Sequence, residues 1–147
     1  MSTRRTFLTG ALLVGSSALA ARSMARPDAG GGEMRFWDNH AGFGYESAKD
    51  IELLDHWRNA GVHYLSVNVG FDLMPWSSTF LAIANYTQAI AAREDYALGA
   101  TLADVEAAWR AGRMAITFDI EGMSALNGEL SLVELYYRLG VRQMAIA

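Results

Sequence analysis

The chain contains no cysteine among its 147 residues, and this absence excludes two kinds of site. Neither a disulfide framework nor a thiolate metal site can form, so any metal ion would have to be held by histidine, aspartate or glutamate. The histidines number only three, His40, His56 and His63. Candidate metal ligands are therefore few.

Basic residues are also scarce. The chain has 12 lysines and arginines against 16 aspartates and glutamates, which gives a formal net charge of -4. No basic run occurs beyond the N-terminus and no motif that reads RNA or DNA is present, so we expect no nucleic acid among the partners. With 52% hydrophobic and 19% charged residues, the composition indicates one globular unit that can bury a core.

The first 25 residues have the features of an export signal. Arg4 and Arg5 form a paired-arginine head, a weakly apolar stretch covers residues 8–20, and small-x-Ala cleavage sites end at Ala20 and Ala25. The segment resembles a twin-arginine signal peptide, which implies a periplasmic or secreted protein. The alternative is a membrane anchor, but the apolar stretch is short for a permanent span. We expect no stable span after removal of residues 1–25, and a flexible leader over residues 26–33.

From residue 34 onward the chain repeats a helix followed by a strand. Each of three units begins with Ser or Thr followed three residues later by an acid, continues as an amphipathic run, and stops at a glycine before a β-rich segment. A further helix is predicted over residues 78–96. The three units begin and stop at Ser47 and Gly61, Thr101 and Gly112, and Ser131 and Gly140.

With residues 35–40 as a first strand, the predicted order is that of a parallel α/β protein with right-handed crossovers. In such proteins the functional residues lie at the C-terminal ends of the strands. The sequence stops inside a predicted strand. We therefore expect residues 34–147 to be the N-terminal half of a longer protein.

The third predicted strand ends in two acids, Asp119 and Glu121, followed by Gly122. Side chains two residues apart on a strand share a face, so these carboxylates should point the same way. Neighbouring carboxylates repel each other, and a metal ion, a shared proton or water at a strand end must accommodate them. His40 ends the first predicted strand and is expected at the same edge of the sheet.

Three segments resemble the N-terminal half of the membrane dipeptidase family, also called renal dipeptidase-like or peptidase family M19. They are FWDNH at 36–40, FDIEG at 118–122 and LYYRLGVR at 135–142, within a resemblance that covers residues 35–147. The resemblance implies half of a (β/α)8 TIM barrel. It also implies a zinc-dependent dipeptidase, which hydrolyses a small dipeptide with a metal-bound hydroxide.

The family's metal ligands can be matched to this sequence in part. In the family the first strand ends in Asp-x-His-x-Asp, whose His and second Asp bind one zinc, and the Glu of a Glu-Gly pair bridges two zincs. Asp38, His40 and Glu121 match by position, whereas Gly42 stands where the second Asp belongs. The resemblance therefore implies one or two zinc ions held by His40 and Glu121, with Glu121 also catalytic, and two further histidine ligands beyond residue 147.

Asp119 is a third candidate metal ligand, because it shares a face with Glu121 and could replace the oxygen lost at Gly42. The alternative role is a hydrogen-bonded acid beneath a metal site that it does not touch. His56 is predicted to face solvent and His63 to be structural.

Two other functions stay open beside the dipeptidase. One is a degenerate binding protein with the same fold, motivated by Gly42. The other is a different metal-dependent hydrolase of the amidohydrolase type, because a fold alone does not determine a reaction. The sequence leaves the oligomeric state open.

Overall fold

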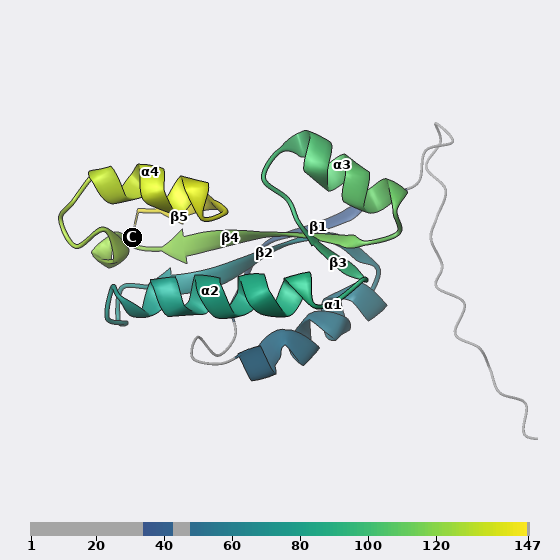
Figure 1. Cartoon of the computed structure of the whole chain (residues 1–147), viewed down its shortest axis with the longest axis horizontal. Coiled ribbons are helices and arrows are strands. Elements are labelled where there is room, and N and C mark those ends of the chain that lie inside the picture. Colours follow the sequence, from purple (N-terminus) through teal and green to yellow (C-terminus); the bar gives the residue numbers. More distant parts are fainter. Residues whose placement is uncertain (1–33, 43–47, 147) are drawn as a thin grey trace, which may run out of the picture.

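A computed structural model of the chain describes residues 34–42 and 48–146. The export signal, the leader and the helix start at Ser47 lie outside these residues. Helices and strands alternate along the chain (Figure 1). The elements are β1 (Phe36–Ala41), the 3-10 helix η1 (Ala48–Leu53), α1 (Leu54–Asn59), β2 (Val62–Phe71), α2 (Ser78–Ala91), β3 (Tyr96–Leu98), α3 (Leu102–Arg110), β4 (Met114–Glu121), the 3-10 helix η2 (Ser124–Leu126), α4 (Ser131–Arg138) and β5 (Val141–Ala145).

All the strand pairs are parallel, as the sequence predicts. The strand order is β1-β2-β4-β3, and β5 also pairs with β4. Because β2 occupies one edge of β4, β3 and β5 share the other edge. β3 pairs with Met114–Ile116 of β4, and β5 pairs with the residues from Phe118 to Glu121. The C-terminal ends of β1, β2, β4 and β5 consequently lie at one end of the sheet.

Two details of the predicted helices are wrong. The helix predicted over residues 78–96 ends at Ala91, and residues 96–98 form β3, a strand too short to show periodicity in the sequence. Ser131 does not cap α4, because the N-cap position is Leu130 and no side chain caps it. By contrast, Thr101 caps α3 in a complete capping box with Asp104, as predicted. The three predicted stop glycines all have a positive φ, at Gly61, Gly112 and Gly140.

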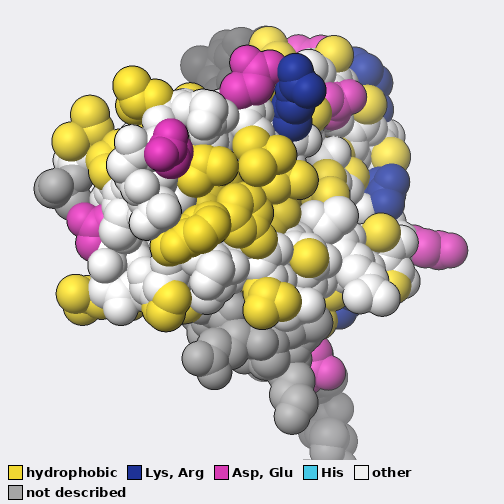
Figure 2. Space-filling view, turned by 60° about the vertical axis from the view of Figure 1, so that its left-hand side comes forward, with side chains coloured by type: hydrophobic (Ala, Val, Ile, Leu, Met, Phe, Trp, Pro, Cys, Tyr) yellow, Lys and Arg dark blue, Asp and Glu magenta, His cyan; other side chains and the backbone are white. Residues whose placement is uncertain are grey.

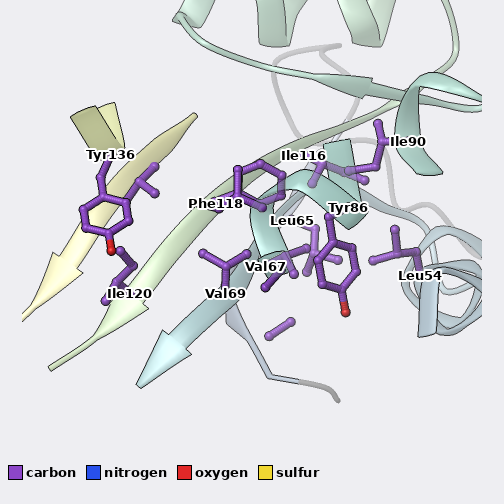
Figure 3. Packing of buried hydrophobic residues seen from close by; sticks show 14 of the residues in the cluster. Leu54, Leu65, Val67, Val69, Tyr86, Ile90, Ile116, Phe118, Ile120 and Tyr136 are labelled. Carbon is purple, nitrogen blue, oxygen red and sulfur yellow. The ribbon is translucent and has the colours of Figure 1, made fainter. Parts of the chain in front are cut away.

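The main core lies on one face of the sheet. Leu65, Val67 and Val69 of β2 alternate with polar residues, and β4 contributes the matching row of Ile116, Phe118 and Ile120. Figure 3 shows most of these side chains on the side of Tyr86 and Ile90 of α2 and Leu54 of α1, whereas Ile120 lies beside Tyr136 of α4. Tyr136 of α4 joins the same core and stacks on Phe80 with ring centroids 5.1 Å apart.

The opposite face of the sheet carries the alternate residues. At its N-terminal half, Tyr64 and Ala115 pack against Val105 and Ala108 of α3, which lies across the strands from α2 (Figure 1). At its C-terminal half the residues are polar. The long β2 and β4 thus carry an apolar row on one face and candidate functional groups on the other.

The sheet is curved. Gln143 Nε2 of β5 donates a 3.1 Å hydrogen bond to the carbonyl oxygen of Asn39 in β1, although β2 and β4 lie between these strands. In a flat sheet the two strands would be about 14 Å apart, farther than a glutamine side chain reaches. The curvature brings the C-terminal ends of β1 and β5 together.

Large hydrophobic side chains also lie on the surface. Leu73, Leu130 and Ile146 are at least 80% exposed, and Figure 2 shows hydrophobic side chains gathered in the middle of one face of the molecule. Within the described residues, no helix combines the length and the apolar character needed to cross a membrane.

Candidate active site

A pocket of about 300 Å³ opens at the C-terminal ends of the strands. Its lining comes from β1, β4 and β5, which the curved sheet brings together. The lining includes His40, Asp119 and Glu121, the three candidate metal ligands, together with Asn39 and Gln143. The structure therefore brings together the residues that the sequence singled out.

The backbone at the end of β1 is fixed by Asp38. One carboxylate oxygen of Asp38 accepts the backbone N–H of His40 at 3.2 Å, and the other accepts the indole N–H of Trp57 at 2.8 Å. Trp57 belongs to α1, so Asp38 ties the strand end to the neighbouring helix. The Asp of the Asp-x-His pair thus positions His40 without facing the pocket.

The imidazole of His40 is oriented by Asp119. Its Nδ1 lies 2.8 Å from Asp119 Oδ1, and the other carboxylate oxygen accepts a 2.7 Å hydrogen bond from Ser66 Oγ. Asp119 is only 3% exposed, and this burial raises its pKa, while the hydrogen bonds from Ser66 and His40 oppose the increase. An ionised Asp119 can only accept, so it keeps the proton of His40 on Nδ1 and leaves a lone pair on Nε2.

Glu121 lies on the far side of the imidazole from Asp119. Its Oε2 is 3.7 Å from His40 Nε2, and both side chains are about half exposed. Two atoms that bind one tetrahedral zinc ion at roughly 2.0–2.2 Å lie about 3.3 Å apart. A neutral imidazole nitrogen and a carboxylate oxygen are both zinc ligands, so His40 and Glu121 fit part of a zinc site.

The rest of a metal site is not found among these residues. Within residues 34–42 and 48–146, no group of three or more His, Asp or Glu is placed so that it could hold a metal ion. Gly42 is exposed and offers no side-chain ligand. Asp119 contacts the other ring nitrogen of His40, which places it outside the gap between Nε2 and Glu121.

The loop after Glu121 is held by Asp72, which follows β2. Asp72 Oδ1 accepts the backbone N–H of Ser124 at 2.8 Å, and this bonding lowers the pKa of Asp72. Gly122 has φ +86°, and a Cβ at that position would lie 2.1 Å from Asp72 Oδ1. The glycine of the Glu-Gly pair is therefore required both by its backbone conformation and by the close approach of Asp72.

Sequence reasoning missed three polar residues at the site. Ser66 holds Asp119, and Gln143 closes the pocket against β1. Asn68 is 1% exposed and pairs in register with Asp119; its Oδ1 accepts the N–H of Gly70, whereas its Nδ2 is buried without an acceptor in the described part of the chain. The alternation of polar and apolar residues along β2 would have identified Ser66 and Asn68.

The other two histidines lie elsewhere. His56 is an exposed residue of α1, as predicted. His63 lies near the start of β2, and its Nδ1 accepts the backbone N–H of Phe36 at 3.3 Å. Neither contributes to the pocket at the C-terminal ends of the strands.

Comparison with known proteins gives a family and a fold. The family model for membrane dipeptidase (peptidase family M19) matches residues 76–147, whereas no curated protein matches the chain. A structure of an amidohydrolase from Pseudomonas aeruginosa is similar over 77% of this chain, with 18% identity and a TM-score of 0.68. A structure described as a dipeptidase of family M19 is similar over 76%, with 14% identity and a TM-score of 0.61.

The chain spans only 34% and 42% of the lengths of these two proteins. Their likeness, together with the curved parallel sheet, identifies the fold as part of a (β/α)8 barrel. The matched residues 76–147 include Glu121 and Gly122 at the end of β4. These residues carry the likeness of the chain to the membrane dipeptidase family, peptidase family M19.

Proposed function

We propose that the protein is a zinc-dependent dipeptidase in which His40 and Glu121 bind the metal. One observation carries the proposal: His40 Nε2 faces Glu121 Oε2 at 3.7 Å at the C-terminal ends of the strands, in a chain of a metallopeptidase family. A catalytic zinc takes about three protein ligands, so we expect further ligands outside the described residues. The activity is proposed for the whole protein, since the chain spans less than half of its structural neighbours.

Each residue of the site has a distinct role in this proposal. When bound, zinc would supply the Lewis acidity that activates water for attack on a peptide carbonyl. Asp119 keeps the proton of His40 on Nδ1 so that Nε2 stays available, and Asp38 fixes the backbone of His40. Hydrolysis then gives a carboxylic acid and a free amine. Gln143 lines the pocket as a polar wall against which the dipeptide would lie.

The proposal is tested with three variants of the whole protein. His40→Ala and Glu121→Gln should each lower the zinc content per chain and reduce the rate of dipeptide hydrolysis by more than about 100-fold. His56→Ala is the matched control, because it removes an exposed histidine that does not line the pocket and should change neither quantity. Zinc content is measured by elemental analysis and hydrolysis by release of free amino acid. Unchanged zinc in both site variants would contradict the proposal.

Gly42 favours a second candidate function, a binding protein that keeps the fold without catalysis, because it leaves the first metal position without an oxygen ligand. Such a protein would bind a dipeptide in a calorimetric titration and leave it intact even with zinc supplied. A different metal-dependent hydrolase, the third candidate, would bind zinc through His40 and Glu121, leave dipeptides intact, and hydrolyse another amide.

A further inference from the structure

A second pocket, of about 330 Å³, lies at the opposite end of the sheet from the candidate active site. It is formed where β1, β2 and β4 begin and where α1 and α3 end. Three arginines line it, Arg35, Arg58 and Arg113, together with His63 and Trp109. Among the described residues that line it there is no aspartate or glutamate. The pocket is therefore strongly basic, in a chain whose formal net charge is -4.

Two arginines outside this pocket, Arg93 and Arg142, have a structural role and make short hydrogen bonds to the protein itself. Arg93 donates to Asp55 and to both carboxylate oxygens of Asp95, at distances from 2.7 to 3.5 Å. Arg142 donates to three backbone carbonyl oxygens at 2.7–2.8 Å. Both guanidinium groups are thus used by the fold itself.

The pocket arginines are only weakly engaged. Arg58 Nε is 3.8 Å from Asp95 Oδ2, beyond hydrogen-bond distance, and that carboxylate is already bound by Arg93. Arg35 lies over the ring of Trp109 at 4.4 Å, a contact that leaves its N–H groups available. Arg113 makes one long bond of 3.5 Å to a carbonyl oxygen, and its Nε is buried with no acceptor in the described part of the chain.

His63 adds a neutral donor to this set. Because its Nδ1 accepts the backbone N–H of Phe36, the proton of the neutral ring is on Nε2. The backbone oxygen of His63 accepts the indole N–H of Trp109 at 2.9 Å, which fixes the aromatic wall of the pocket. The pocket thus combines N–H donors that no residue in the described part of the chain fully engages with a rigid wall.

Guanidinium charges gathered around one pocket repel each other, and a bound anion removes that repulsion. Arginine binds phosphate oxygens with paired, charge-assisted hydrogen bonds. A volume near 300 Å³ is at the lower end for pockets that hold small molecules. We propose that the pocket lined by Arg35, Arg58, Arg113 and His63 binds a phosphate group, either as inorganic phosphate or as part of a small phosphorylated molecule.

Calorimetric titration of the whole protein with inorganic phosphate, with a pentose phosphate and with the same unphosphorylated pentose tests this inference. Inorganic phosphate or the pentose phosphate should bind with a stoichiometry of one molecule per chain, and the affinity should fall as the ionic strength rises. The free pentose should not bind. Tighter binding of the pentose phosphate identifies a phosphorylated molecule as the ligand. Equal binding identifies the phosphate group alone.

Arg35→Gln and Arg58→Gln should each weaken the binding about tenfold or more. Both replace exposed side chains, and thermal unfolding checks that each variant folds. Arg110→Gln is the matched control, because it removes the same charge from the exposed face of α3, where Arg110 pairs with Glu106 at 3.8 Å. The inference is overturned if phosphate binding does not saturate, or if Arg110→Gln weakens the binding as much as the two pocket variants do. It is also overturned if His40→Ala abolishes the binding while the two pocket variants leave it unchanged.

Discussion

His40 and Asp119 are 79 residues apart in the sequence, yet Nδ1 of the one lies 2.8 Å from Oδ1 of the other. The contact joins the ends of β1 and β4 across β2, and Ser66 of β2 holds the second oxygen of Asp119. The carboxylate is therefore bound on both sides, and the free nitrogen of the imidazole faces Glu121. This arrangement favours a role in which Asp119 orients the candidate metal ligand His40 over a role in which Asp119 binds the metal itself.

Asp119→Asn in the whole protein should weaken zinc binding about 10–100-fold while the number of zinc ions at saturation is unchanged. The reason is that a neutral amide holds the Nδ1 proton of His40 less strongly than a carboxylate. Zinc competition with a chelator gives the affinity, and ¹⁵N NMR of His40 reports the tautomer. If instead Asp119→Asn loses about one zinc per chain at saturation and Gly42→Asp restores it, Asp119 is a direct ligand.

Much of the candidate site could be predicted because strand alternation is local. The pattern in β4 places Asp119 and Glu121 on one face, and the position of His40 at a strand end places it at the same edge. Gln143 was missed because its role depends on the curvature of the sheet, which no local pattern contains. Ser66 lies in the alternating pattern of β2, but its bond to Asp119 depends on the register between β2 and β4. The three-residue β3 was missed for a similar reason, since it exists through its pairing with β4.

Two of the three predicted helix caps, Thr101 and Ser131, lie within the described residues, and a difference in backbone conformation explains why only one of them was right. Thr101 is extended, with φ -133° and ψ 167°, so its side chain can accept from Asp104 N–H. At α4 the preceding residue, Leu130, is already helical, with φ -63° and ψ -24°, and Ser131 falls inside the helix. A Ser-x-x-Glu pattern cannot reveal that an upstream turn starts the helix one residue earlier.

Thr101→Ala should therefore lower the free energy of unfolding by about 1 kcal/mol, because it removes the capping hydrogen bond. Ser131→Ala should change it by less than about 0.5 kcal/mol, since no capping bond is lost there. Denaturant unfolding of the two variants beside the parent protein measures both values. Equal losses would mean that Ser131 contributes to the start of α4 in solution.

Gly122→Ala should destabilise the protein more than Gly61→Ala, although both glycines have φ +86°. Each substitution forces an alanine into the left-handed region, at a cost of about 1–2 kcal/mol. At Gly61 nothing lies within 4 Å of the new Cβ, whereas at Gly122 the new atom meets the carboxylate of Asp72. The clash adds about 1–3 kcal/mol. Thermal unfolding compares the two, and equal shifts would show that Asp72 moves aside freely.

Replacement of Arg4 and Arg5 by lysine tests the export proposal. A twin-arginine signal depends on the arginine pair itself, so the double variant should accumulate as precursor in the cytoplasm. Cell fractionation with immunoblotting measures the distribution. A double variant that is still processed and exported like the parent would contradict a twin-arginine route.

Arg93 lies between Asp55 and Asp95 and links α1 to the segment that precedes β3. The hydrogen bond from Tyr96, followed by that from Arg93, lowers the pKa of Asp55, and Arg93 lowers the pKa of Asp95. A carboxyl group whose pKa is lower in the folded state stabilises the fold above its unfolded pKa of about 3.9, and this stabilisation is lost as the pH falls through the folded value. Acidification below about pH 4 should therefore weaken this cluster.

Arg93→Gln should lower the free energy of unfolding at pH 7 by about 1–2 kcal/mol, a modest value because all three charged side chains are between a quarter and two fifths exposed. The difference from the parent protein should shrink as the pH falls below about 4, because protonated Asp55 and Asp95 no longer interact strongly with Arg93. Arg110→Gln, which breaks a longer and more exposed pair, should cost less than about 0.5 kcal/mol at pH 7. Denaturant unfolding at several pH values between 3 and 7 gives these differences. The free-energy difference between Arg93→Gln and the parent protein could also stay constant down to pH 3. In that case the effect would not come from the two carboxylates. It would come from packing of the Arg93 side chain against Tyr96, over whose ring it lies at 4.7 Å.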